Sequence, residues 1–196
     1  MFRLLCVTNR KLCKEEFLCH LEKILQERPG GLILREKDLS PKDYEALAGQ
    51  VLALCARYEV PCMLHGFFEA AKNLDHRAIH LPMPVLRDLS REQRSFFEVL
   101  GASCHSVEEA REAQRLGCTY ITAGHIFATD CKQGVPGRGL EFLGQICRAV
   151  SVPVYAIGGI EAERLPGVRK AGAAGACLMS SLMQTEDFGI LKENHS

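Results

Sequence analysis

Eight short apolar segments recur along this 196-residue chain, and most of them are apolar on both faces. Successive residues of a strand point to opposite sides, so a strand without a polar face must be covered on both sides. The expected strands are Arg3–Thr8, Gly31–Arg35, Pro61–His65, Ala78–Leu81, Glu98–Ser103, Thr119–Gly124, Pro153–Ile157 and Gly175–Met179. The pattern therefore predicts a parallel sheet buried beneath helices.

Helical patterns with recognisable starts and stops separate several of these strands. A Ser-Pro pair precedes Asp43–Tyr58. Proline suits the first turn of a helix because the N–H groups there have no partner within the helix. Ser106 and Glu109 have the spacing of a capping box before Ala110–Leu116. Two further helices are expected over Glu141–Val150 and Glu161–Ala171. Repeated strand–helix units of this kind predict an α/β fold with right-handed crossovers.

Eight strands favour a closed (β/α)8 TIM barrel, with an open doubly wound sheet as the alternative. The chain is short for a barrel, so we expect tight loops and a shortened last helix. We expect one compact domain over residues 1–190 and a tail over residues 191–196.

The charge and cysteine content limit the classes of partner and compartment. The 24 basic and 24 acidic residues cancel, which gives no indication of nucleic acid or an anionic membrane as partner and is compatible with a homodimer. None of the 10 cysteines forms a Cys-x-x-Cys pair, which disfavours a zinc site. No apolar run reaches the roughly 20 residues of a membrane span, and the N-terminus lacks a signal-peptide pattern. We expect a cytoplasmic protein with reduced thiols.

Barrel enzymes of this kind carry their chemistry at the carboxyl ends of the strands. After the sixth strand comes a glycine-rich loop, Gly124–Lys132, that begins with His125. Imidazole exchanges protons near neutral pH, whereas glycine backbone and lysine suit a phosphate. The loop therefore indicates proton transfer on a small phosphorylated substrate, although an isolated histidine is more often structural.

Three other strand ends favour anion binding. Gly158 and Gly159 follow the seventh strand, and Ser180 and Ser181 follow the eighth, where barrels often hold a phosphate on backbone N–H groups. At the end of the second strand, alternation places Arg35 and Lys37 on one face and Glu36 on the other. A plain tight turn and a solvated ion-pair cluster are the structural alternatives.

Histidine and cysteine residues at the other strand ends leave further alternatives. His65 and His80 are expected to line the pocket, and with His125 they form a conceivable three-histidine metal site. Cys104 next to His105 is a poor nucleophile pair because neighbours on a strand face opposite ways. Cys131 is better placed to form such a pair with His125. For both cysteines, however, the role of a small apolar side chain is favoured.

The order and spacing of several segments resemble the thiamine phosphate synthase/TenI superfamily of small (β/α)8 barrels, over nearly the whole chain. These segments are Leu34–Lys37, Ile79–Leu81, Gly101–Ser106, Gly124–Lys132, Ile157–Ile160 and Ala171–Gly175. The synthase branch places carboxylates after strands three and four to hold magnesium, but here His65–Phe67 and Leu81–Pro84 occupy those places. The chain is more similar to TenI, from which it departs at Phe67–Phe68 and in its shorter tail.

The resemblance to TenI implies thiazole tautomerase activity, with His125 as acid and base. In this reaction a carboxylated dihydrothiazole phosphate isomerises to the aromatic thiazole carboxylate phosphate, and no metal or cofactor is expected. Thiamine phosphate synthase activity and a non-catalytic, thiazole-phosphate-binding regulatory protein are the alternatives. The expected substrate-binding residues are Arg35, Lys37, His65, Ser103, Thr129, Lys132, Gly158, Gly159, Ser180 and Ser181.

Overall fold

The eight predicted strands close into a parallel barrel in a computed structural model that describes residues 2–128 and 136–195. The strands are β1 (Arg3–Val7), β2 (Gly31–Leu34), β3 (Cys62–His65), β4 (Ala78–Pro82), β5 (Val99–Cys104), β6 (Tyr120–Gly124), β7 (Val154–Ile157) and β8 (Gly175–Leu178). Strand β1 pairs in parallel with both β2 and β8, so the sheet has no free edge. Closure confirms the barrel over the open sheet.

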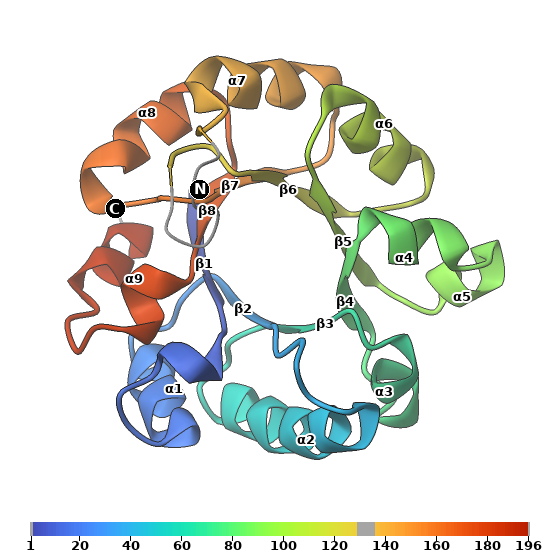
Figure 1. The fold of residues 1–196 in the computed structure, drawn as a ribbon, viewed down its shortest axis with the longest axis vertical. Helices are drawn as coiled ribbons and strands as arrows, with labels where there is room; N and C mark the ends of the chain where they lie inside the picture. The colour runs from blue at the N-terminus through green and yellow to red at the C-terminus, as the bar shows by residue number, and fades with distance from the viewer. Residues whose placement is uncertain (1, 129–135, 196) are drawn as a thin grey trace.

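Helices surround the barrel as an outer ring (Figure 1). They are α1 (Phe17–Gln26), α2 (Pro41–Arg57), α3 (Phe68–Asn73), α4 (Met83–Asp88), α5 (Arg91–Ser95), α6 (Val107–Arg115), α7 (Gly139–Ala149), α8 (Leu165–Lys170) and α9 (Ser180–Met183). Short 3-10 turns are η1 (Arg10–Leu12), η3 (Ala162–Arg164) and η4 (Gly189–His195). The side chains of Ser40 and Ser106 accept capping hydrogen bonds from Asp43 N and Glu109 N. The capping box predicted at Ser106 forms only in part, because the Glu109 carboxylate accepts the backbone N–H of His105 instead.

The helix predicted over Glu161–Ala171 is confirmed in its position, but only Leu165–Lys170 of it is α-helix. A 3-10 turn, η3, precedes α8, and Pro166 lies in the first turn of α8, where its missing N–H is tolerated. The last helix is shortened as expected, because α9 covers only Ser180–Met183. Leu191, in the predicted tail, is fully buried.

Strand alternation divides the apolar side chains into two layers. The larger layer lies between the strands and the helices, and the smaller fills the barrel itself. The buried members of the inner layer are Leu5, Val7, Ile33, Met63, Tyr120 and Cys177. These side chains form the floor beneath the carboxyl ends of the strands, so the barrel is filled below and open above.

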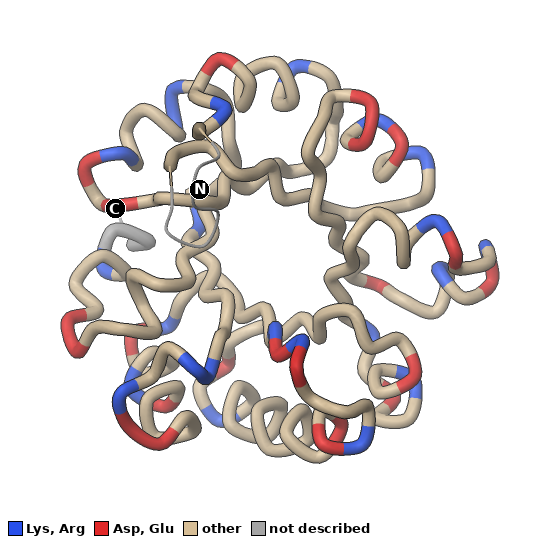
Figure 2. The backbone as a smooth tube through the Cα atoms, viewed as in Figure 1, with Lys and Arg blue, Asp and Glu red and all other residues tan. Residues whose placement is uncertain are grey.

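Charged residues gather on the outer helices, and a further cluster lies on the segment after β2 at the barrel mouth (Figure 2). Within the described part of the chain, no helix combines the length and apolar character needed to cross a membrane.

Candidate active site

A cavity of about 540 Å³ opens at the carboxyl ends of the strands. It brings together nine of the residues predicted from the sequence: His125, Arg35, Lys37, His65, Ser103, Gly158, Gly159, Ser180 and Ser181. Thr129 and Lys132 lie outside the described residues, and so does Cys131. Glu161 is the only carboxylate among the described lining residues, which makes the cavity suited to an anion.

The cationic side of the cavity is held by a buried carboxylate. Arg35 and Lys37 line the cavity, while Glu36 points away and is only 2% exposed. Glu36 accepts hydrogen bonds from Thr8 Oγ1 at 2.7 Å and from Arg10 Nη1 at 3.0 Å. Thr8 Oγ1 in turn accepts the backbone N–H of Arg35 at 2.9 Å. The alternation predicted from the sequence therefore places two cations inward and one buried anion behind them.

Tyr44 of α2 ties the ends of β2 and β3 together. Its hydroxyl donates to Leu34 O at 2.7 Å and accepts the backbone N–H of His65 at 2.8 Å. The Tyr44 ring stacks on Phe67 with centroids 4.0 Å apart. Phe67 and Phe68 pack against the core and are absent from the described cavity lining. These two aromatic residues therefore belong to the layer that supports the cavity.

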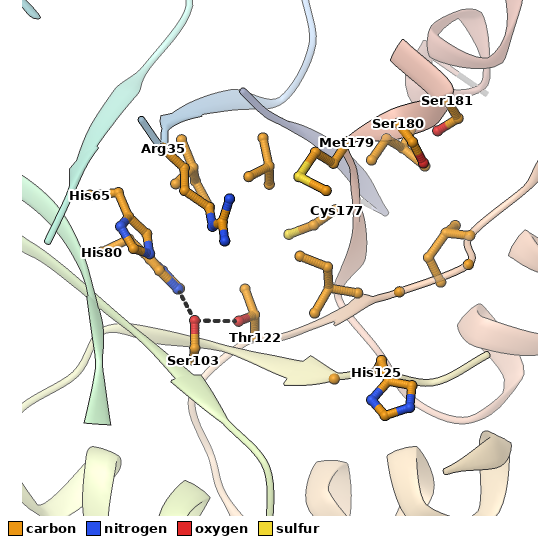
Figure 3. A pocket seen from close by; sticks show the side chains of 18 of the residues that line it. Arg35, His65, His80, Ser103, Thr122, His125, Cys177, Met179, Ser180 and Ser181 are labelled. Carbon is orange, nitrogen blue, oxygen red and sulfur yellow. Dashed lines mark hydrogen bonds between the residues drawn. The ribbon is translucent and has the colours of Figure 1, made fainter. Parts of the chain in front are cut away.

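Two stacked histidines lie beside Arg35, on the same side of the cavity (Figure 3). The rings of His65 and His80 lie 5.7 Å apart between centroids. Burial, with added repulsion from Arg35 and Lys37, lowers the pKa of His65 to about 3. Burial, with a smaller effect of His65, also holds the pKa of His80 well below its ordinary value. Both rings are therefore neutral at pH 7.

Hydroxyl groups engage both nitrogens of His80. Nε2 lies 2.8 Å from Ser103 Oγ, and Nδ1 lies 2.9 Å from the Tyr120 hydroxyl. Thr122 Oγ1 lies 3.5 Å from Ser103 Oγ, beside the cavity (Figure 3). Tyr120 and Thr122 were not predicted as site residues. They alternate along β6 with outward-facing residues, so they point into the barrel on the same side of the strand as Gly124.

The glycine pair after β7 lies against the segment that follows β6. Gly158 and Gly159 have φ values of 101° and 62°, which favour glycine. A Cβ on Gly158 would lie 2.5 Å from the Cβ of His125. Backbone N–H groups of Ile126 and Phe127 donate to the carbonyls of Ile157 and Gly158 at 2.9 and 3.0 Å. The two loops therefore form one continuous surface.

His125 is buried at the edge of the cavity. Its Nε2 lies 3.1 Å from the carbonyl oxygen of Pro136. A carbonyl only accepts, so Nε2 carries the hydrogen and the lone pair of a neutral ring lies on Nδ1. Figure 3 shows His65 and His80 at one side and His125 at the other, with Ser103 and Thr122 between them.

This separation argues against the three-histidine metal site. Over residues 2–128 and 136–195, no three or more histidine, cysteine, aspartate or glutamate side chains group in a way that could hold a metal ion.

Cys104 faces away from the cavity. It is buried in the layer beneath the helices, and burial raises the pKa of its thiol to about 12. Its neighbour His105 lines the cavity, with Nδ1 3.0 Å from Gly124 O. The opposite orientations exclude a nucleophile pair of these two residues.

Comparison with known proteins gives a consistent family. The model of a family described as thiamine monophosphate synthase matches residues 4–182. Thiamine-phosphate synthase 2 of Streptococcus pneumoniae is 32% identical over 99% of this chain and 96% of its own length. Thiamine-phosphate synthase of Syntrophomonas wolfei is 31% identical over 95% of this chain and 91% of its own length. The structure of thiamine phosphate pyrophosphorylase from Pyrococcus furiosus superposes with a TM-score of 0.84 at 28% identity, covering 99% of this chain and 94% of that one.

Proposed function

Because this chain belongs to the thiamine monophosphate synthase family, we propose that it acts on a phosphorylated thiazole and that its reaction is the tautomerisation of the carboxylated dihydrothiazole phosphate. The observation that carries this choice is the character of the cavity. Two cations and the neutral side chains of His65 and His80 line it, with Glu161 as the one carboxylate among its described residues. Magnesium prefers several oxygen ligands, and this donor set does not fit it.

The reaction needs only a proton shift. The C–H bond at the ring carbon bearing the carboxylate breaks, and its electrons form a double bond within the ring. The exocyclic double bond moves, and the side-chain carbon takes up a proton. Atoms and charge balance without any oxidant or metal, and the aromatic product supplies the driving force.

His125 is the group we assign to this proton transfer. Nε2 lies at the Pro136 carbonyl and Nδ1 is buried, so we assign the proton transfer to the imidazole and to neither nitrogen in particular. A positioned acid–base group of this kind contributes about 10²–10⁴-fold to a rate.

Anion recognition completes the proposed site. Backbone N–H groups beside Gly158, Gly159 and Ser180 suit the phosphate, because the glycines leave room for a close approach. Arg35 and Lys37 offer positive charge to the substrate's anionic groups. Outside the described residues, Thr129 and Lys132 are proposed as further contacts.

The decisive experiment follows the ultraviolet spectrum of the dihydrothiazole carboxylate phosphate on mixing with the purified protein. We expect conversion to the aromatic product, at an undiminished rate in the presence of EDTA. Binding without any spectral change would contradict the tautomerase and favour the non-catalytic alternative.

Thiamine phosphate synthase is the second candidate, because both sequence relatives described above are named for that activity. It is tested by incubating the protein with the pyrimidine pyrophosphate, the thiazole phosphate and magnesium, and measuring thiamine phosphate. Clear turnover would overturn the tautomerase assignment. Its absence, together with turnover in the ultraviolet assay, would exclude the synthase.

A further inference from the structure

We propose that His80 is a positioning residue that directs the hydroxyl hydrogen of Ser103 into the cavity, where it donates to an acceptor atom of the bound substrate. The inference deepens the proposed function and rests on it for the identity of the ligand. It is carried by a chain of hydrogen bonds that runs from the barrel floor to the cavity, through Tyr120, His80 and Ser103.

The chain begins at Tyr120, whose position depends on Gly101. The two residues are paired across β5 and β6, and a Cβ on Gly101 would overlap the Tyr120 ring. Because Gly101 has no side chain, the Tyr120 phenol reaches across β5 to His80, the residue of β4 that is paired with Gly101. Tyr120 belongs to the apolar inner layer and is not among the described lining residues of the cavity.

The direction of the Tyr120 hydrogen bond follows from burial. Among the described residues, the one hydrogen-bond partner of the Tyr120 hydroxyl is His80 Nδ1. If that nitrogen carried a hydrogen, the phenol O–H would be buried without an acceptor, which is unfavourable. The Tyr120 hydroxyl therefore donates to Nδ1.

The state of His80 then determines that of Ser103. Burial keeps His80 neutral, so with Nδ1 accepting, Nε2 carries the hydrogen and donates to Ser103 Oγ. Thr122 Oγ1 approaches the same oxygen at 3.5 Å and supplies a second, longer donor. With its lone pairs facing these two groups, the Ser103 hydroxyl has its own hydrogen left for the cavity that Ser103 lines.

This arrangement recognises an acceptor and disfavours a donor at the same position of the ligand. A carboxylate or phosphate oxygen of the substrate fits it, whereas an N–H group does not. A buried tyrosine remote from the ligand thus contributes to specificity through two intervening side chains.

The first test is nitrogen NMR of the imidazole groups in the ligand-free protein at pH 7, with His80 assigned by the loss of its signals in His80→Gln. We expect the neutral tautomer that is protonated at Nε2. The tautomer protonated at Nδ1, or an imidazolium, would overturn the proposal. This readout is independent of which reaction the protein catalyses.

The second test is a double-mutant cycle on the affinity for the thiazole carboxylate phosphate, measured by calorimetry. Ser103→Ala and Tyr120→Phe should each weaken binding by about three- to tenfold, the effect of one hydrogen bond. The double variant should match Ser103→Ala alone, because Tyr120 acts only through Ser103.

Tyr155→Phe is the matched control. Tyr155 packs edge-on against Tyr120 with centroids 5.8 Å apart, and its variant should bind like the wild type. Additive effects of Ser103→Ala and Tyr120→Phe would overturn the positioning role. Failure of the wild type to bind this compound would instead contradict the proposed function, and the NMR spectrum would still decide the role of His80.

Discussion

His80 and His125 both lie at carboxyl ends of barrel strands, but the structure holds them in different ways. His80 lies in the barrel wall with a hydroxyl group at each ring nitrogen. His125 lies on the loop after β6, and its Nε2 contacts a backbone carbonyl of the same loop. Figure 3 shows them on opposite sides of the cavity.

The difference separates orientation from proton transfer. A buried imidazole with both nitrogens engaged by neutral groups has no nitrogen left to exchange a proton with a ligand. A ring on a loop, with one nitrogen at a backbone carbonyl, can still exchange a proton with a ligand. We therefore assign chemistry to the loop histidine and positioning to the wall histidine.

The largest expected effect is that of His125→Ala. It should lower kcat by about 10²–10⁴-fold, because the acid–base group is lost while the anion-binding residues remain. Steady-state kinetics in the ultraviolet assay measures it, together with calorimetric binding of the product. The matched control is His76→Ala, since His76 Nε2 also contacts a backbone carbonyl, Cys62 O at 2.8 Å, but outside the cavity. An unchanged kcat in His125→Ala would refute the division of roles.

The next largest effect is expected for Gly158→Ala, which disturbs the surroundings of His125 and not those of His80. The new Cβ would lie 2.5 Å from the His125 Cβ, and the φ of 101° is unfavourable for alanine. The free energy of unfolding should fall by about 2–4 kcal/mol, as a sum of backbone strain and overpacking. Denaturant unfolding and kcat are measured on the same preparation.

Gly117→Ala separates strain from contact. Gly117 has a similar φ of 94°, but nothing lies within 4 Å of a Cβ there. Its variant should lose only about 1 kcal/mol and retain full kcat. If both variants lost activity equally, the contact between Gly158 and His125 would not be what positions the ring.

The barrel itself follows from the sequence because most of its strands are short runs that are apolar on both faces and many are separated by helical patterns. Each observed strand end lies within one residue of its prediction, as β6 at Tyr120–Gly124 illustrates. Helices α3, α4 and α5 were missed because they are only six, six and five residues long, too short for a helical period to show. Helix α1, which has ten residues, was missed as well.

The candidate site was predictable only in part. Arg35 and Lys37 follow from alternation along one strand, and so does the outward direction of Glu36. The link from Tyr120 to His80 depends instead on Gly101, on the strand between them, being too small to block it. No pattern along the chain reports such a contact across three strands, because it depends on the barrel's register.

Acid should destabilise the fold through the wall histidines. The pKa of His65 is about 3 in the folded protein, against an ordinary value near 6.5, so between these values the unfolded chain binds more protons. Stability therefore falls as the pH decreases from about 6.5 towards 3. Between pH 7.5 and pH 5, the free energy of unfolding should fall by about 2 kcal/mol less in His65→Gln than in the wild type. Equal losses in both proteins, measured by urea unfolding, would contradict a neutral buried His65.

The smallest effect is expected at Arg164, which supports the His125 loop and leaves the barrel wall untouched. Its Nη1 donates to Gly159 O at 2.5 Å, and its guanidinium lies 4.8 Å from the centroid of the Phe127 ring. Arg164→Ala should lower kcat/KM by about two- to fivefold, the scale of one cation–π contact.

The control for this variant is Arg169→Ala, which removes an equivalent contact, 4.9 Å from the Phe2 ring, away from the cavity. Its kcat/KM should equal that of the wild type. The His80 nitrogen spectrum should remain unchanged in Arg164→Ala, because no hydrogen bond of the Tyr120–His80–Ser103 chain involves the loop. A shifted His80 tautomer would show that the two histidines are coupled, and the assignment of separate roles would have to be abandoned.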